Sequence, residues 1–148
     1  MYNIVATMRL VLDTSVIVAA LGSRRGASNA VLGLVADRQL TPLATPALFL
    51  EYEDVLKRPE GQRRVHDLSN DQIDRVLAAL ASAVEPVTVH IAWRPQLKDP
   101  NDEMVFDAAV NGRADAVVTF NVSDFAEPAR KFGLSVIRPA ELLERMRR

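Results

Sequence analysis

The stretch that most constrains the fold is Met8 to Ala20, MRLVLDTSVIVAA, in which one carboxylate separates two apolar runs. Arg9–Leu12 predicts a short buried strand, and the apolar run that follows Asp13 predicts a helix at about Thr14–Leu21. A carboxylate in such surroundings is costly unless something compensates its charge. A strand that ends on an acid and leads into a helix places that acid at the edge where α/β sheets bind their ligands. We therefore interpret Asp13 as the first residue of a functional site.

Short apolar runs alternate with helical patterns along the chain, and this alternation predicts a parallel sheet covered by helices on both faces. The other expected strands are Thr41–Ala44, Ala116–Thr119 and Ser135–Ile137, and Val87–Ile91 is either a weak strand or an extended linker. The other expected helices are Asn29–Arg38 capped by Ser28, Pro46–Lys57 capped by Thr45, Gln72–Ala83 opened by Ser69, Asp99–Val110, and one from Pro139 to the end. Glu60–Asp67 has room for one more helical turn.

The composition is that of one globular domain. The chain has 148 residues, of which 49% are apolar and 25% charged, so it suffices for one core and is too short for two ordinary domains. The absence of cysteine excludes a disulfide scaffold and a cysteine-ligated zinc site, and it fits a cytoplasmic protein. No apolar run or signal-like N-terminus indicates a membrane partner or secretion. We expect a single domain over residues 8–148, with residues 1–7 as an N-terminal extension and Met8 as an alternative start.

Two acids on predicted helices are candidates for the same site as Asp13. Glu51 lies at the border of the apolar stripe of the helix Pro46–Lys57, a position that also suits an ordinary surface residue. Asp102 shares a helix face with Val105, so its side chain is expected to point into the fold. The acids off these stripes, which are expected in solvent, are Glu53, Asp54 and Asp107.

The segment around Asp102 also has a purely structural explanation. Asp99 suits the N-cap of the helix and Pro100 its first position, and both acids would offset the positive end of the helix dipole. We assign Asp99 to capping, with a supporting role in the site, and Asp102 to the site itself.

A second strand end delivers polar residues to the same edge of the predicted sheet. Asn121 and Asp124 follow the strand Ala116–Thr119 in VVTFNVSDF. The alternative explanation is that Asn121 or Ser123 caps one helical turn. We retain both Asn121 and Asp124 as candidates.

Carboxylates that converge from several elements raise one another's pKa by repulsion, and a hard divalent cation removes that conflict. A site made only of oxygen ligands favours Mg²⁺ or Mn²⁺ over zinc. Such a site activates water and neutralises charge on a phosphodiester, with one metal ion or two. These residues therefore indicate metal-dependent hydrolysis of a phosphodiester.

The other residues that could bind a metal ion or a phosphate group form no recognisable motif. His66 and His90 belong to no metal-ligand spacing, and GSRRGAS lacks the lysine of a phosphate-binding loop. The net charge of −1 leaves nucleic-acid binding to a local basic patch. The candidates for a phosphate contact are Arg24, Arg25, Arg58, Arg63 and Arg64, although a solvated charged face explains any one of them.

Four segments in this order, VLDTSVIVAAL, EYEDVLKRP, DPNDEMVFDAAV and ADAVVTFNVSDF, together resemble the PIN-domain family. The resemblance is nearest to the PIN toxins of prokaryotic type II toxin–antitoxin systems, and it extends from Met8 to the C-terminal helix. It implies a three-layer α/β/α sandwich around a central parallel sheet. It also implies a Mg²⁺- or Mn²⁺-dependent endoribonuclease that acts on RNA, forms a homodimer and is held inactive by a cognate antitoxin.

The resemblance further implies which residues form the site. The family's first three acids and its hydroxyl-bearing residue correspond to Asp13, Glu51, Asp102 and Ser15. Asn121 stands where many members carry an aspartate, so either Asn121 or Asp124 completes the metal shell. An uncharged asparagine at that position would weaken the site.

Two other functions compete with a nuclease. A phosphohydrolase of the haloacid-dehalogenase type resembles a strand-end Asp-x-Asp pair, but Ser15 occupies the second position of that pair here. A PIN-like domain that has lost activity and binds RNA or protein remains compatible with Asn121. Binding of Mn²⁺, and its loss when Asp13 and Asp102 are replaced by alanine, separates an intact site from such a binding module.

Overall fold

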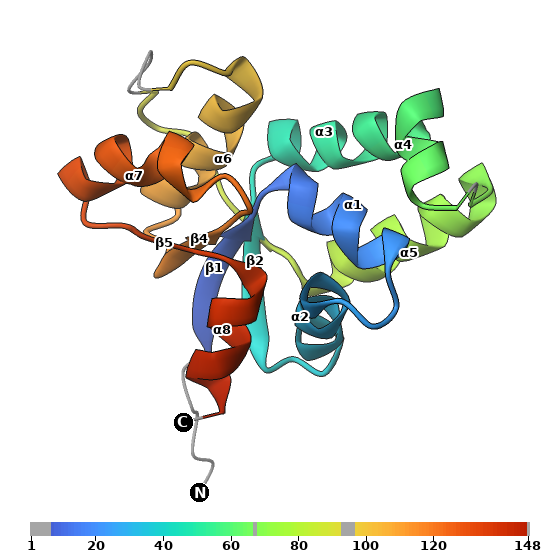
Figure 1. The fold of residues 1–148 in the computed structure, drawn as a ribbon. Helices are drawn as coiled ribbons and strands as arrows, with labels where there is room; N and C mark the ends of the chain where they lie inside the picture. Colours follow the sequence, from blue (N-terminus) through green and yellow to red (C-terminus); the bar gives the residue numbers. More distant parts are fainter. Residues whose placement is uncertain (1–6, 67, 93–96, 148) are drawn as a thin grey trace, which may run out of the picture.

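The structure is a computed structural model that describes residues 7–66, 68–92 and 97–147. Its strands are all parallel and form one sheet in the order β3–β2–β1–β4–β5. The strands are β1 at Met8–Leu12, β2 at Leu40–Ala44, β3 at Glu85–Pro86, β4 at Ala116–Val118 and β5 at Ser135–Ile137. The expected α/β architecture, with a central parallel sheet between helices, is confirmed (Figure 1).

The helices cover both faces of the sheet. They are α1 at Thr14–Gly22, α2 at Ala27–Ala36, α3 at Pro46–Lys57, α4 at Pro59–Arg64, α5 at Asn70–Ala83, α6 at Pro100–Asn111, α7 at Val122–Lys131 and α8 at Pro139–Met146. In Figure 1, α1 to α5 lie to the right of the sheet and α6 and α7 to its left. The last helix, α8, packs against α2, while α3 and α6 contact each other across the carboxyl edge of the sheet.

The strand order changes direction at β1. From β1 the chain proceeds outward to β2 and β3, and it then returns to the other side of β1 to form β4 and β5. The point where an α/β sheet changes direction opens a crevice at the carboxyl ends of the two strands concerned. Here those strands are β1 and β4, which are followed by Asp13 and Thr119.

The strands next to this crevice are buried on both faces, which is why the sequence shows them as continuous apolar runs rather than alternating ones. Leu10, Val11 and Leu12 of β1 are fully enclosed, and so is the whole of β4. Two helix starts agree with the sequence: the hydroxyl of Thr45 accepts a hydrogen bond from the backbone N–H of Leu48, and Ser69 forms a capping box at α5.

Two local predictions need correction, and one open alternative is decided. Ser28 is a buried residue inside α2 and does not cap it, because the helix already begins after Gly26. Of the two alternatives for Val87–Ile91, the linker holds rather than the strand: β3 ends before it, and the N–H of Val87 continues toward β2, donating to the carbonyl of Ala44. The residues after Asn121 form the full helix α7 rather than one turn, although Pro128 lies within it.

The polar segment after Pro59 forms α4, as its composition allows, and Asp67 lies outside the described residues. The same holds for residues 1–6 of the expected extension. Thr7 is described, and its hydroxyl is hydrogen-bonded to that of Thr41 on β2. Among the described helices, none has both the length and the apolar character that crossing a membrane requires.

Candidate metal centre

Asp13 is held at the crevice between β1 and β4 by two hydroxyl groups. Its Oδ2 accepts hydrogen bonds from the Oγ of Ser15 at 2.9 Å and from the Oγ1 of Thr119 at 2.7 Å. Its backbone N–H donates to the carbonyl of Val118, so the end of β1 is tied to β4. The side chain is 6% exposed and makes no capping bond to α1. Asp13 therefore does not serve as a side-chain cap of α1, and within the described chain its Oδ1 makes no hydrogen bond.

Tyr52 supports the same strand end from α3. Its buried hydroxyl donates a hydrogen bond to the carbonyl of Leu12, the residue before Asp13. Burial raises the pKa of the Tyr52 phenol above its ordinary value of 10.0, and the nearby charge of Asp13 raises it further. The phenol therefore remains a hydrogen-bond donor throughout the physiological pH range.

Glu51 precedes Tyr52 on α3 and brings a second carboxylate to this edge. Its side chain is only 9% exposed, and its Oε1 is buried with no hydrogen-bond partner in the described chain. Burial raises the pKa of Glu51, the charge of Arg58 opposes this, and Asp54 and Asp99 raise the pKa further. An orphaned, buried carboxylate oxygen is costly and marks a position where a cation would be favourable.

Asp102 lies in the first turn of α6, on the opposite side of the crevice, and is 9% exposed. Its pKa rises from the ordinary value of 3.8 to about 6, first because the group is buried and then because of four neighbouring carboxylates. Those neighbours are Asp13, Asp99, Asp124 and Glu103. The chain thus brings acids from three separate regions into electrostatic reach of Asp102.

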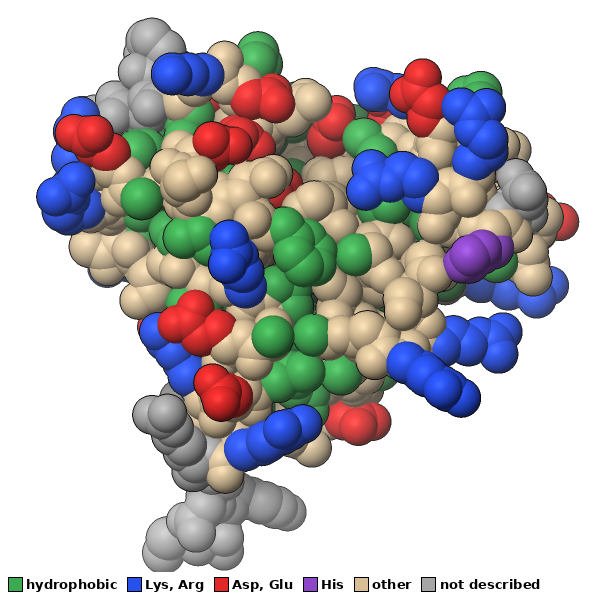
Figure 2. Space-filling view, in the orientation of Figure 1, with side chains coloured by type: hydrophobic (Ala, Val, Ile, Leu, Met, Phe, Trp, Pro, Cys, Tyr) green, Lys and Arg blue, Asp and Glu red, His purple; other side chains and the backbone are tan. Residues whose placement is uncertain are grey.

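A cavity of about 410 Å³ between α6 and α7 is open to this group of acids. Asp99, Asp102, Asp124 and Glu127 line it on the acidic side, and Lys98 and Lys131 are its basic residues. Figure 2 shows acidic side chains around the hollow at the top of the molecule, between the α6–α7 part and the α3 part.

The two weaker candidates differ in position. Asp124 lines the cavity beside Asp102 and raises the pKa of Asp102. Asn121 is the exposed N-cap residue of α7; its backbone N–H donates to the Oγ1 of Thr119, and its carbonyl accepts from the N–H of Asp124. Asp99 caps α6 as expected, by accepting a hydrogen bond from the N–H of Asn101.

These residues suit a hard divalent cation in their chemistry. All the candidate donors are oxygens, the carboxylates repel one another, and the orphaned Oε1 of Glu51 lacks a partner that a cation would supply. Within the described ranges, however, no three Asp, Glu or His side chains form a group able to hold a metal ion as they stand. Asp102 is within electrostatic reach of Asp13 and Asp124, and Glu51 within reach of Asp99, but these acids do not form a closed set of ligands.

Thr119 is a residue of the candidate site that the sequence did not single out. Its hydroxyl donates to Asp13 and accepts from the N–H of Asn121, so it joins the two strand ends. The available signal was a hydroxyl residue that closes the otherwise apolar run Ala116–Val118.

The prediction that Asp107 is exposed is wrong, because this side chain is only 5% exposed. Helix α6 packs against β1, β2, β4, α3 and α7, so it is enclosed on more faces than the single stripe assumed from the sequence. Glu103 on the same helix is buried as well, and its Oε1 accepts a hydrogen bond from the N–H of Leu97. Glu103 thereby positions the segment that leads into α6.

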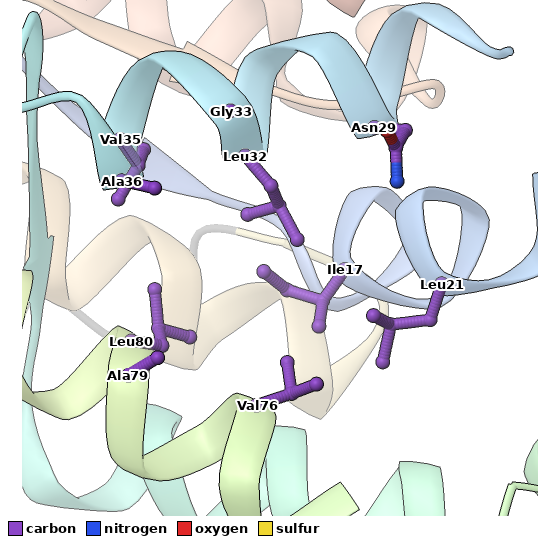
Figure 3. Close-up of a pocket in the computed structure, with 10 residues that line it drawn as sticks. All are labelled: Ile17, Leu21, Asn29, Leu32, Gly33, Val35, Ala36, Val76, Ala79 and Leu80. Atoms are coloured by element: carbon purple, nitrogen blue, oxygen red, sulfur yellow. The ribbon is translucent and has the colours of Figure 1, made fainter. Parts of the chain in front are cut away.

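A second hollow, of about 330 Å³, lies on the other side of α1, between α1, α2 and α5 (Figure 3). Aliphatic side chains such as Ile17, Leu32 and Leu80 line it, and its single polar side chain, Asn29, donates to the carbonyl of Ala20. No ionisable group lines this hollow, so it offers none of the acid chemistry of the crevice.

Comparison with known proteins identifies the family and the fold. A family model described as PIN domain matches residues 9–123, whereas no match was found among curated proteins. The fold is similar to a solved structure described as VapBC2 from Rickettsia felis bound to a DNA fragment from their promoter. That likeness has a TM-score of 0.56 and 16% sequence identity, and it covers 88% of this chain and 98% of the other. Because the family model spans most of the chain, including β1, α3, α6 and β4, this protein belongs to the PIN-domain family.

Proposed function

We propose that this protein is a Mg²⁺- or Mn²⁺-dependent endoribonuclease and the toxin component of a type II toxin–antitoxin system. The observation that carries the proposal is the environment of Asp13. This carboxylate is buried at the switch point of the sheet, is oriented by Thr119, and raises the pKa of Asp102 across the crevice. Membership in the PIN-domain family supports nuclease chemistry at such a site.

The acids have distinct roles in this proposal. The residues that would hold the cation are Asp13, Glu51, Asp102 and Asp124, with Asp99, Asn121 and Ser15 in support. When bound, the cation supplies an activated water and neutralises charge on the phosphodiester. Ser15 and Thr119 fix the orientation of Asp13 before anything binds, and Asp102 must lose its proton before it can act as a ligand.

The experiment is a cleavage assay on structured RNAs with Mg²⁺, with Mn²⁺ and with EDTA, with wild type and Asp13→Asn side by side. We expect cleavage only with the divalent cations and only by the wild type. The Asp13→Asn change removes a charge while adding almost no volume, so circular dichroism should show an unchanged fold. Cleavage that persists in EDTA or in the folded variant would rule out this proposal.

A cognate antitoxin in the cytoplasm is the proposed partner, and a homodimer is the proposed assembly. The similar structure from Rickettsia felis contains a VapBC2 complex, which supports a protein partner for this chain. An antitoxin segment would enter the acidic crevice and place an arginine or lysine against the carboxylates. Inhibition that survives replacement of that basic residue by glutamine would contradict this mode of binding, and light scattering tests the dimer.

A second candidate function is a weakened PIN-like module that binds RNA or protein without cutting it. Two observations favour it: Asn121 supplies no charge, and the described acids do not form a closed set of metal ligands. A Mn²⁺ titration by calorimetry separates the two functions. Binding that disappears in the Asp13→Ala and Asp102→Ala variants indicates the enzyme, and no Mn²⁺ binding by the wild type indicates the module.

A further inference from the structure

Four arginines that the proposed reaction does not use lie at the far end of α1 from Asp13. Arg24 and Arg25 occupy the turn between α1 and α2, and Arg63 and Arg64 form the last turn of α4. All four are exposed, and none of them makes an ion pair within the described part of the chain. We call these four residues the arginine patch.

Tertiary contacts bring the two halves of the arginine patch together. Gly22, the last residue of α1, packs so closely on α4 that a Cβ there would lie 2.7 Å from the carbonyl oxygen of Arg64. The ring nitrogen Nε2 of His66, just after α4, is hydrogen-bonded to the carbonyl of Gly22 at 2.8 Å. The turn that carries Arg24 and Arg25 is therefore anchored beside the end of α4. Figure 2 shows basic side chains along the right edge of the molecule, where these helices lie.

Helix stabilisation alone does not account for this concentration of charge. A cation at the C-terminal end of a helix interacts favourably with the helix dipole, but one arginine per helix would suffice for this. The chain has a net charge of −1, so four arginines without ion pairs are a local excess of positive charge. Exposed guanidinium groups without carboxylate partners are suited to bidentate contacts with phosphate.

We propose that the arginine patch binds the sugar–phosphate backbone of the RNA on one side of the position that is cut. This inference rests on the proposed nuclease function for the nature of the ligand. Helix α1 has nine residues and is about 13 Å long, so the patch is separated from Asp13 by the length of roughly four stacked nucleotides. The acids repel an approaching phosphodiester, and the patch supplies the attraction that offsets this repulsion. Such contacts position the strand without selecting its sequence.

The experiment measures binding of a fluorescein-labelled, single-stranded 12-nucleotide RNA by anisotropy in EDTA, so that nothing is cut. The patch variants are the pair Arg24→Gln/Arg25→Gln and the pair Arg63→Gln/Arg64→Gln. The matched control is Arg145→Gln/Arg147→Gln on and just after α8, which changes the net charge by the same amount. We expect each patch pair to weaken binding about tenfold and to lower the slope of log K against log salt by about 1.4, while the control changes neither.

Two further measurements test whether the patch acts through its charge and at a distance from the acids. Arginine-to-lysine versions of both pairs should recover most of the binding, because they keep the charge. A two-nucleotide RNA is too short to span from Asp13 to the far end of α1, so its cleavage in Mg²⁺ should be the same for the wild type and the patch variants. All variants should retain the wild-type melting temperature, since the four side chains are exposed.

The outcomes separate the patch from the nuclease proposal. The proposal for the arginine patch is contradicted if the wild type and the patch variants bind RNA equally. It is also contradicted if the α8 control loses as much RNA affinity as the patch variants do. If RNA binding depends on the patch but the protein never cuts RNA in Mg²⁺ or Mn²⁺, the patch proposal is supported and the nuclease proposal is contradicted. Cleavage of long RNA by the patch variants at the wild-type KM overturns the patch and leaves the nuclease intact.

Discussion

The two ends of α1 carry opposite charges and differ in burial. At the N-terminal end, Asp13 is enclosed and held by hydroxyl groups, with Asp102 and Glu51 buried nearby. At the C-terminal end, the arginine patch is exposed and has no ion-pair partners in the described chain. Negative charge at the N-terminal end and positive charge at the C-terminal end both interact favourably with the dipole of α1.

The difference teaches how each kind of site can be detected. A carboxylate between two buried segments is an anomaly at the level of single residues, because burial of an unpaired charge is costly. An exposed arginine is ordinary on any protein surface. The patch becomes visible only when contacts between Gly22, Arg64 and His66 join two separate segments. We expect the acid end to control chemistry and the arginine end to control binding, and the following predictions test that division.

The largest expected effect is on catalysis by Asp13→Asn. Loss of this charge should lower kcat/KM for RNA cleavage by on the order of 10³-fold or more, because the cation would lose its best-positioned ligand. Binding of the 12-nucleotide RNA in EDTA should not weaken, because the arginine patch is untouched. The matched control is Asp37→Asn at the exposed end of α2, which should cleave normally. If Asp13→Asn weakens RNA binding as much as cleavage, the two ends are not separate in function.

Thr119→Val should have the next largest effect, as a test of positioning. The substitution keeps the shape of the side chain and removes the hydroxyl that donates to Asp13. Residues that orient a metal ligand typically contribute 10- to 100-fold in metal affinity, so we expect the Kd for Mn²⁺ to rise by about that factor. Calorimetry measures this directly, with Thr88→Val on the exposed segment after β3 as the control. An unchanged Kd would mean that Asp13 does not depend on this contact.

The stability of the metal-free protein should depend on pH through Asp102. Its pKa is about 6 in the folded protein against an ordinary 3.8, so the folded state binds the proton more tightly than the unfolded chain does. The stabilisation from protonated Asp102 is complete below about pH 3.8 and is lost as the pH rises through about 6. In EDTA, the melting temperature should therefore fall between pH 4 and pH 7, and it should fall less in Asp102→Asn.

Asp13→Asn provides a second test of the same repulsion. By removing one of the charges that act on Asp102, it should raise the melting temperature in EDTA at pH 7. Saturating Mn²⁺ should remove the higher melting temperature of the variant relative to the wild type, since Mn²⁺ binding stabilises the folded wild type. A lower melting temperature of Asp13→Asn in EDTA would show that hydrogen bonds to Asp13 outweigh the repulsion.

The smallest expected effect is that of Tyr52→Phe on stability. The change removes the hydroxyl that donates to the carbonyl of Leu12 and leaves the ring in the core. We expect a loss of about 1 kcal/mol in the free energy of unfolding, measured by urea denaturation. RNA binding in EDTA should be unaffected, and a decrease there would break the division between the two ends of α1.

Much of the architecture was predictable from sequence because local and global preferences agree. Parallel strands buried on both faces must be apolar along their length, so β1 and β4 stand out as short continuous runs. Thr45, Ser69 and Asp99 cap helices at the predicted positions, since these side chains satisfy free N–H groups within a few residues. Asp13 was predictable for the same reason, as a polar residue at a strand end.

The predictions failed where distant elements decide the environment. Asp107 is buried because α6 is packed against strands and helices from both halves of the chain, which no helical stripe reveals. For Val87–Ile91 the sequence left a strand and a linker open, and the linker is observed because the segment lies beyond the two-residue pairing of β3 with β2. The helix α7 was underestimated because Pro128 normally argues against a helix interior.

The sequence by itself determined the parallel α/β fold and which acids are candidates for the site, because hydrophobic periodicity and buried charge are properties of single segments. Only the tertiary structure decided that Thr119 orients Asp13, that Asp102 is driven to a raised pKa, and that the arginine patch forms one surface. Each of these depends on the distance between residues far apart in the chain. The order of the strands around β1 sets those distances, and no local pattern encodes them.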